Sequence, residues 1–171
     1  MTDSSPHAAS HIALDHAEVE LTIAKTPEEI HEYYRIRHQV FVLEQKMFEE
    51  TDLDYHDEGA IPIIARVGGH VVGAVRCYPN RPGVWFGGRL AVHPEYRTWH
   101  IGALLVRKAV EVMAGRSDVR RFLALIQLQN VRFFKRLGWL CLGKPFNYHG
   151  RKHQMMERIL ERTATGEEAN G

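Results

Sequence analysis

The segment spanning residues 89–105 constrains the fold most, because it predicts a strand, a tight turn and a helix in immediate succession. Residues 90–92 form a short apolar run that is typical of a buried strand. Pro94 ends this strand, because proline has no N–H group to donate to a sheet ladder. From Ile101 onward the apolar residues return at helical spacing, and Gly115 predicts the end of that helix.

The start of the predicted helix has the features of an anion-binding site. Its first backbone N–H groups lack helical acceptors and lie at the positive end of the helix dipole. Gly102 carries no side chain, so a phosphate can approach the backbone closely there. Periodicity alone favours a simple strand–loop–helix connection, because most helix starts bind nothing.

The residue types in this segment are a second indication of an anion-binding site. The run LAVHPEYR at residues 90–97, followed by Ile101-Gly102 and a helix, resembles motif A of the GNAT superfamily, the GCN5-related N-acetyltransferases. In that family Arg/Gln-x-x-Gly-x-Gly/Ala follows the strand, and its turn amides bind the pyrophosphate of acetyl-CoA. The resemblance implies acetyl-CoA as co-substrate and assigns the following residues to coenzyme binding: Leu90, Ala91, Val92, Arg97, Thr98, Trp99, His100, Ile101, Gly102, Ala103, Asn130 and Phe133.

One of these positions departs from the family pattern. Arg97 and Gly102 match it, and Ala103 suits the helix, but His100 replaces the first glycine. Its Cβ atom either restricts the turn, or its imidazole faces the phosphates. We expect this change to affect the strength of coenzyme binding.

Length and composition predict one soluble globular domain. The 171 residues are 44% hydrophobic and 25% charged, and the chain is long enough to bury a core. We expect the domain at residues 17–160, with disordered tails at 1–16 and 161–171. The net charge of +1 argues against a nucleic-acid partner, and no apolar stretch is long enough for a membrane span.

Cysteine and histidine usage predicts a cytoplasmic protein without a metal site. Cys77 and Cys141 both lie in apolar, strand-like runs, so we interpret them as reduced core residues. His7, His11 and His16 near the N-terminus are irregularly spaced and have no cysteine partners, which favours solvated side chains over a metal site.

Other segments predict the remaining elements. Residues 18–24 alternate as a strand does, and Thr26-Pro27 with Glu29 forms a capping-box helix start. Gly68-Gly69 indicates a hairpin between strands at 61–67 and 70–78, with a loop at 79–83. The resemblance implies an α/β (α+β) GNAT fold, with a mixed, mostly antiparallel, twisted sheet of about six to seven strands. It also implies about four flanking helices and a splay between strands 4 and 5.

Two segments after the first helix bear on the acceptor. Residues 37–45 resemble the R-x-x-V-F-x-x-E-Q element of a GNAT branch and of acyl-homoserine-lactone synthases. Within it, Glu44 either has a raised pKa and accepts a proton, or it caps the helix or pairs with an arginine. The acidic run at 49–58 is usually a solvated loop, and we hypothesise that Asp52, Asp54 and Asp57 attract a cationic acceptor.

The C-terminal third adds the other candidates. Residues 120–126 predict a buried strand, and 127–139 a short helix ending at Gly138. The second segment resembles the N-x-x-A-x-x-x-F-Y-x-x-L-G-F segment of the family. Phe134 occupies the position of the family tyrosine, which often protonates the leaving thiolate, and phenylalanine has no proton to give. Two closing strands follow, joined by residues 146–151.

The sequence therefore leaves open which residues transfer protons. Glu44, His149 and His153 are candidate bases, and Tyr148 is the candidate replacement acid. A reaction without an acid is also tenable, because thiolates leave readily.

The resemblance predicts an N-acetyltransferase that transfers acetyl from acetyl-CoA to the amine of a small molecule or amino acid. Direct attack in a ternary complex is the expected mechanism. An acyl-homoserine-lactone-synthase-like enzyme and a non-catalytic CoA-binding sensor are the alternatives. GNAT proteins often dimerise, and a homodimer formed through the C-terminal strands is left open.

Overall fold

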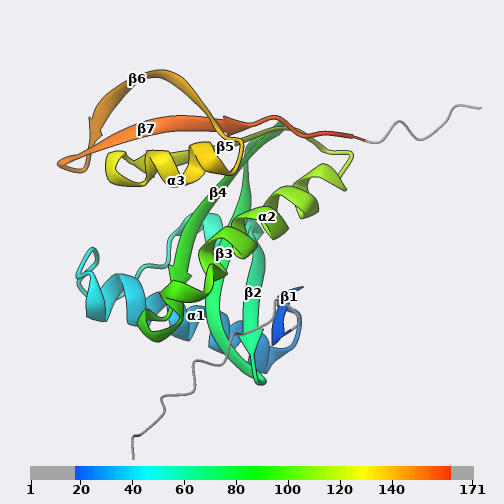
Figure 1. Ribbon diagram of the computed structural model, residues 1–171, viewed down its shortest axis with the longest axis vertical. Helices are drawn as coiled ribbons and strands as arrows, with labels where there is room; N and C mark the ends of the chain where they lie inside the picture. The colour runs from blue at the N-terminus through cyan, green and yellow to red at the C-terminus, as the bar shows by residue number, and fades with distance from the viewer. Residues whose placement is uncertain (1–17, 163–171) are drawn as a thin grey trace, which may run out of the picture.

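A seven-stranded mixed sheet organises the computed structural model, which describes residues 18–162 (Figure 1). Its order is β1-β2-β3-β4-β5-β7-β6, and every pair is antiparallel except β4–β5. The strands are β1 (Val19–Ile23), β2 (Ile61–Val67), β3 (His70–Arg81), β4 (Gly83–Val92), β5 (Val119–Gln127), β6 (Leu140–Tyr148) and β7 (Arg151–Arg158). The expected tail at 1–16, with its three histidines, and nearly all of the tail at 161–171 lie outside the described residues.

Within residues 18–162, seven helical segments connect and cover these strands. They are α1 (Pro27–His38), the π-helix η2 (Gln39–Glu44), the 3-10 helices η3 (Tyr55–Gly59), η4 (Pro94–Trp99) and η5 (Leu128–Asn130), α2 (Ile101–Ala114) and α3 (Val131–Arg136). The capping box of α1 is confirmed: Thr26 Oγ1 accepts from the Glu29 N–H at 3.1 Å, and the Glu29 carboxylate accepts from the Thr26 N–H at 3.2 Å. Such a cap typically contributes about 1 kcal/mol.

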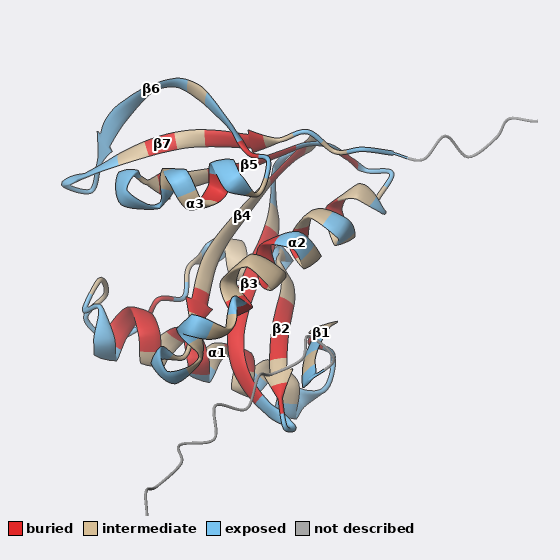
Figure 2. Cartoon of the chain, viewed as in Figure 1, coloured by how far each residue is buried: buried red, intermediate tan, exposed pale blue. Residues whose placement is uncertain are grey.

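The two faces of the sheet are covered by different helices. Along β2, Ile63 and Ala65 belong to the core on the α2 side, whereas Ile64 packs with α1 residues such as Ile36 on the other side. This alternation follows from the two-residue period of a strand. Figure 2 shows buried residues along β2, β3 and β4, where both faces are covered.

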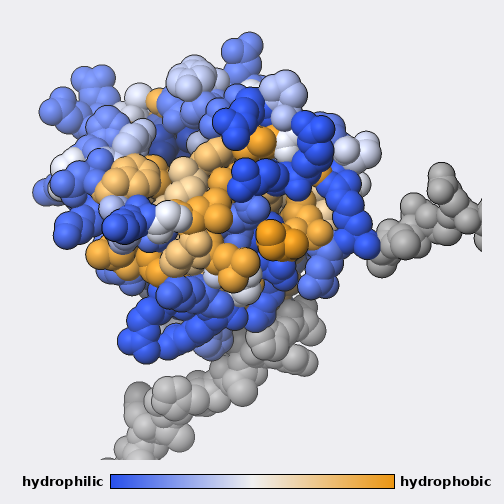
Figure 3. Space-filling model, turned by 90° about the horizontal axis from the view of Figure 1, so that it is seen from above, coloured by the Kyte–Doolittle hydropathy of each residue, from blue (hydrophilic) through white to orange (hydrophobic). Residues whose placement is uncertain are grey.

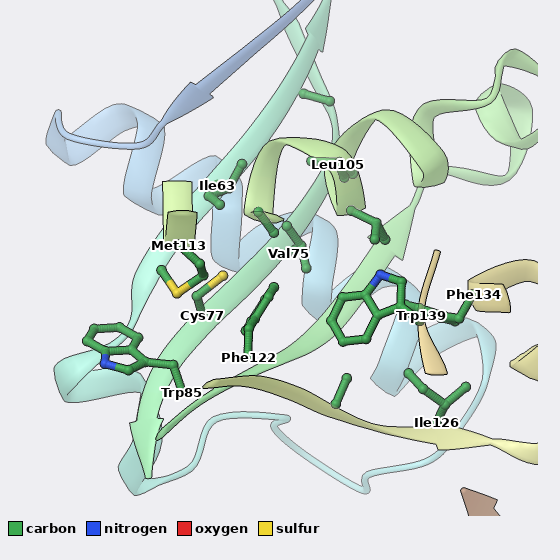
Figure 4. Packing of buried hydrophobic residues seen from close by; sticks show 14 of the residues in the cluster. Ile63, Val75, Cys77, Trp85, Leu105, Met113, Phe122, Ile126, Phe134 and Trp139 are labelled. Atoms are coloured by element: carbon green, nitrogen blue, oxygen red, sulfur yellow. The ribbon is translucent and has the colours of Figure 1, made fainter. Parts of the chain in front are cut away.

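Packing under α2 is close. A Cβ atom on Gly73 of β3 would lie 2.8 Å from Leu105 Cδ1 and 3.1 Å from the Ala91 carbonyl oxygen. Only glycine therefore lets α2 pack on β3 at this point. Beside this contact, the Trp139 ring lies 5.2 Å from that of Phe122 and 5.5 Å from that of Phe134 (Figure 4).

The two central strands diverge halfway along their length. β4 and β5 are parallel and joined by α2, and they pair only from Gly83 with Val119 to Gly87 with Ala124. The remainder of β4, from Gly88 to Val92, has no strand partner on its β5 side among the described residues. The splay that was predicted between strands 4 and 5 is thus confirmed, as are the strand number and the mixed topology.

Three local predictions were wrong. The expected loop at 79–83 is reduced to a turn at Pro82, because a register shift between Pro79 and Arg81 lets the β3–β4 ladder pass a residue without an N–H group. The expected helix at 127–139 is split into η5 and α3. Cys141 is exposed on edge strand β6 and is not a core residue.

Strand β6 is exposed along almost its whole length (Figure 2). Its exposed side chains include Leu140, Phe146 and Tyr148. Figure 3 views the molecule from the side of β6 and β7, and hydrophobic surface is visible there between polar margins. The homodimer left open by the sequence stays untested.

Candidate active site

The end of β4 is irregular where the sheet opens. Gly88 pairs with Arg76 and Ala91 with Ala74, so two residues of β4 face one residue of β3. One of the two, Arg89, has a φ angle of +52°. This is a β-bulge with a non-glycine residue in the left-handed region, a conformation that costs roughly 1–2 kcal/mol.

The bulge lies in the part of β4 that β5 leaves unpaired. Successive N–H groups of a strand point to opposite sides, so the amides of this part face β3 and the open gap in turn. Leu90, Ala91 and Val92, which were predicted to bind the coenzyme, lie here, at the end of the strand.

The turn after β4 is formed despite the missing glycine. Pro94–Trp99 is the 3-10 helix η4, and His100 then adopts φ 60° and ψ 20°. This left-handed conformation is the one for which glycine is favoured, and histidine is among the residues that enter it most often after glycine. The His100 side chain makes no capping hydrogen bond.

Helix α2 begins directly behind this turn with free N–H groups. Its first backbone hydrogen bond runs from the Leu104 N–H to the His100 carbonyl, at 3.1 Å. The N–H groups of Ile101, Gly102 and Ala103 precede this bond and have no acceptor within the helix.

The other predicted coenzyme residues surround this helix start. Arg97, Thr98 and His100 are exposed, and Trp99 packs edge-on against Tyr96 at 4.8 Å. A Cβ atom on Gly102 would lie 3.7 Å from Phe133 Cζ, so α3 brings Phe133 to the turn. Asn130 is exposed at the end of η5.

Glu44 forms an ion pair with Arg97. Arg97 Nη1 lies 2.7 Å from Glu44 Oε2, and Arg97 Nη2 donates to Oε1. These hydrogen bonds, and secondarily the charge of Arg97, lower the pKa of Glu44 despite its partial burial. The expected raised pKa is therefore wrong, and the alternative, pairing with an arginine, is confirmed.

A buried ionic cluster lies beside the bulge of β4. Arg37, which is completely buried, donates to Asp52 Oδ2 at 2.8 Å, to Asp57 Oδ1 at 2.6 Å and to the Tyr33 hydroxyl at 2.9 Å. Burial alone would raise the pKa of Asp57, but the Arg37 hydrogen bonds and the Asp54 N–H lower it to about 2. Asp57 is thus held in the ionised form.

Two further arginines complete the cluster. Arg76 makes hydrogen bonds of 2.6 and 2.8 Å to the two oxygens of Asp54. Arg89 donates to the Asp52 carbonyl at 3.2 and 2.9 Å and to Asp54 Oδ2 at 3.3 Å, and its guanidinium lies 4.6 Å from the Phe48 ring centroid. The side chain of the bulge residue is thereby fixed to the acidic loop.

The cluster changes the interpretation of the acidic loop. Three arginine charges neutralise Asp52, Asp54 and Asp57. The expected solvated loop is therefore wrong for these three carboxylates. The hypothesis that they attract a cationic acceptor is wrong as well. The sequence did contain a signal for it. Arg76 stands within a buried strand, where an arginine needs a carboxylate partner.

The β6–β7 hairpin carries the remaining candidates. His153 Nδ1 lies 2.9 Å from the Arg151 carbonyl oxygen. A carbonyl can only accept, so Nδ1 carries the proton in the neutral ring and Nε2 keeps a free lone pair. The Tyr148 ring packs edge-on against that of His153 at 5.5 Å, and His149 turns the hairpin with φ 48°.

Phe134 is buried in the core against Trp139 and Phe133 and leaves the acid position without a hydroxyl group.

Within residues 18–162, no cluster of three or more potential ligands could hold a metal ion. In the same part of the chain, no helix has both the length and the apolarity that a membrane span requires.

Comparison with known proteins gives concordant results. The model of the Acetyltransferase (GNAT) family matches residues 27–139. The chain is 31% identical over 137 residues to the uncharacterized N-acetyltransferase YjcF of Bacillus subtilis (strain 168), covering 79% of this chain and 96% of that protein.

Solved structures show the same fold. A putative N-acetyltransferase from Lactobacillus plantarum has a TM-score of 0.76 at 20% identity, covering 84% of this chain and 99% of the other. The CoA-dependent acyl-homoserine lactone synthase BjaI, with SAM and isopentyl-CoA, has a TM-score of 0.66 at 19% identity, covering 85% and 84%. At these identities the likeness concerns the fold alone.

Proposed function

This chain belongs to the GNAT family of N-acetyltransferases, and on that premise we propose that it transfers acetyl from acetyl-CoA to the amine of a small molecule or amino acid. One observation carries the proposal. Three N–H groups at the start of α2 lack helical acceptors and follow the part of β4 that β5 leaves unpaired. Donors for a diphosphate and for a thioester carbonyl therefore lie along one opening.

In the proposed reaction both substrates are bound, and the ammonium group of the acceptor first loses one proton to a base. The neutral amine then attacks the thioester carbonyl, the C–N bond forms, the C–S bond breaks, and the thiolate leaves with the bonding electrons. The second amine proton ends on the thiolate. The free amides among Leu90, Ala91 and Val92 stabilise the developing oxyanion, each by roughly 3 kcal/mol. Holding the amine against the thioester supplies much of the remaining rate enhancement.

His153 is the base that the geometry supports best. Its Nε2 is an acceptor in the neutral ring, because Nδ1 is directed at the Arg151 carbonyl. Of the other two candidates, Glu44 is held by Arg97, and His149 lies at the turn of the hairpin. Tyr148, which packs against His153, is the candidate donor to the thiolate, since Phe134 cannot serve.

A pair of matched substitutions tests the coenzyme site. Gly102→Glu and Gly115→Glu each add one carboxylate, at opposite ends of α2. In both cases the new Cβ would make only ordinary contacts, at 3.7 Å or more and at 3.6 Å or more, respectively. Both variants should keep the fold, because glutamate is favoured over glycine in helices, and the melting temperature checks this. Calorimetric titration with CoA should show at least a tenfold loss of affinity for Gly102→Glu only, because the carboxylate repels the diphosphate and obstructs its approach to the backbone.

Equal CoA affinity in the two variants would refute the proposed site, and absence of CoA binding to the unchanged chain would refute the proposed function. Stabilisation by S-adenosylmethionine instead of CoA would favour the synthase-like alternative. A thiol-release assay with acetyl-CoA and a panel of small amines and amino acids completes the test. Binding of CoA without release of thiol would favour the non-catalytic sensor.

A further inference from the structure

Arg97, the arginine of the coenzyme turn, has every nitrogen of its guanidinium engaged within the chain. Nη1 and Nη2 donate to the two carboxylate oxygens of Glu44, and Nε donates to the Val92 carbonyl at 3.2 Å. The carboxylate thus stands where an anionic group of a ligand would meet this guanidinium.

The pair joins two distant parts of the chain. Glu44 is the last residue of η2 and is 53 positions away from Arg97 in η4. Both side chains are partly exposed, with 34% and 43% of their surfaces accessible. Exposed ion pairs of this kind contribute little stability, so a stronger anion displaces the carboxylate at low cost.

A diphosphate is such an anion. It carries more charge than a carboxylate, and arginine binds phosphate groups with two parallel hydrogen bonds. The N–H groups of Ile101, Gly102 and Ala103, which follow Arg97 closely in the chain, are the donors that the proposed function assigns to the same diphosphate. Glu44 occupies both Nη atoms of Arg97 in the free chain, so a diphosphate that binds these two atoms takes the place of the carboxylate.

The segment that follows Glu44 leads into the opening between β4 and β5. Met47 Sδ lies 3.9 Å from Gln127 Nε2, at the end of β5. Phe48, the next residue, stacks on the guanidinium of Arg89 at the bulge of β4. Glu44 is therefore placed between the coenzyme turn and the segment that spans the opening.

The nearby aspartates do not compete for this role. Asp52, Asp54 and Asp57 are each bonded to an arginine of the buried cluster. A carboxylate released from Arg97, in contrast, has no other cation in direct contact with it among the described residues.

Building on the proposed function, we propose that Glu44 binds the ammonium group of the acceptor and is released for this by the coenzyme diphosphate, which takes its place on Arg97. In the free chain Arg97 binds Glu44. In the coenzyme complex Arg97 binds the diphosphate, and Glu44 is free to bind the acceptor. The acceptor binds well only after the coenzyme, and by linkage it also strengthens coenzyme binding. The assignment limits acceptors to amines that are cationic when they bind.

The first test measures CoA affinity by calorimetry in Glu44→Gln and in the control Glu49→Gln. Glu49 is an exposed carboxylate five residues further on, without an ion pair among the described residues. Glu44→Gln removes the competitor and should bind CoA about two- to fivefold more tightly. Glu49→Gln should bind like the unchanged chain.

A double-mutant cycle separates competition from a general loss of charge. In the Arg97→Gln background, which binds CoA more weakly, Glu44→Gln should no longer improve the affinity. An equal improvement in both backgrounds, or in Glu49→Gln, overturns the exchange on Arg97. Undetectable CoA binding by the unchanged chain would instead be a failure of the proposed function.

The second test uses the amine of the panel that gives the fastest thiol release. Glu44→Gln should raise the KM for this amine by roughly tenfold to a hundredfold, because a charge-assisted contact is lost, with kcat within about threefold. An unchanged KM overturns the assignment of Glu44 to the acceptor. A lower kcat with an unchanged KM identifies Glu44 as the base instead, which also overturns it.

Discussion

Replacing Arg37 by methionine should expose how much the domain depends on its buried ionic cluster. The change keeps an unbranched side chain of similar length and removes the guanidinium. Five hydrogen bonds to Asp52, Asp57 and Tyr33 are lost with it. The two carboxylates stay behind in a site where Arg37 itself is completely buried and Asp52 is 1% exposed.

The expected cost follows from these contacts. Removing one partner of a buried ion pair typically costs 3–5 kcal/mol, on the order of the stability of many domains. Arg76 and Arg89 still compensate part of the charge, so we expect a loss of about 4 kcal/mol. For a domain of about 150 residues, this corresponds to a fall in melting temperature of roughly 10–15 °C.

Urea unfolding followed by circular dichroism measures this loss, with Arg35→Met as the matched control. Arg35 lies on the same helix but is exposed, and its ion pair with Glu32 is a surface pair. Its replacement should cost no more than about 1 kcal/mol. A loss in Arg37→Met no larger than in Arg35→Met would refute the reasoning.

Acid provides a second check on the same variant. In the unchanged chain the pKa of Asp57 is lowered to about 2, so its contribution is complete above its unfolded pKa near 4 and is lost as the pH falls toward 2. Without Arg37 only the Asp54 N–H and the charge of Arg76 still lower this pKa, so most of the contribution is absent. The stability gap between the two proteins should therefore narrow by about 1–2 kcal/mol between pH 4 and pH 2, and a constant gap would contradict the assignment.

Three further substitutions test separate features. Gly73→Ala should lower the free energy of unfolding by about 1–3 kcal/mol in urea titration, because its Cβ would meet Leu105 at 2.8 Å; unchanged stability would contradict the close packing of α2. His100→Gly should raise the free energy of unfolding by about 0.5–1 kcal/mol, because glycine relieves the left-handed conformation; a loss would show that the imidazole stabilises the turn. His153→Asn should slow thiol release at least a hundredfold at unchanged CoA affinity, and a normal rate would exclude His153 as the base.

The elements near the coenzyme were predictable because their signals are local. The strand, the proline and the apolar period after Ile101 predict strand, turn and helix within 89–105, and the structure has all three. The capping box at Thr26 is equally local, since both of its partners lie within four positions. The motif, with a glycine at this position, already required such a turn. Only the presence of a histidine at position 100 was unexpected.

The interactions beside the acceptor could not be derived in the same way. Arg37 and Asp57 are 20 positions apart, Arg89 and Asp52 are 37 positions apart, and no sequence period connects them. Local composition suggested the opposite result, because a run of acidic residues usually faces solvent. Only the sheet, which brings β3 and β4 under the acidic loop, turns these separate charges into one neutral buried cluster.

The cluster and the coenzyme turn together explain why the bulge of β4 can persist. A left-handed arginine is unfavourable, and neither neighbouring strand fixes it, since β3 is out of register there and β5 has diverged. The Arg89 side chain supplies the missing constraint through the Asp52 carbonyl and Asp54. The cost of the bulge is thus offset by contacts outside the sheet, and the free amides of β4 can stay directed at a substrate instead of completing a ladder.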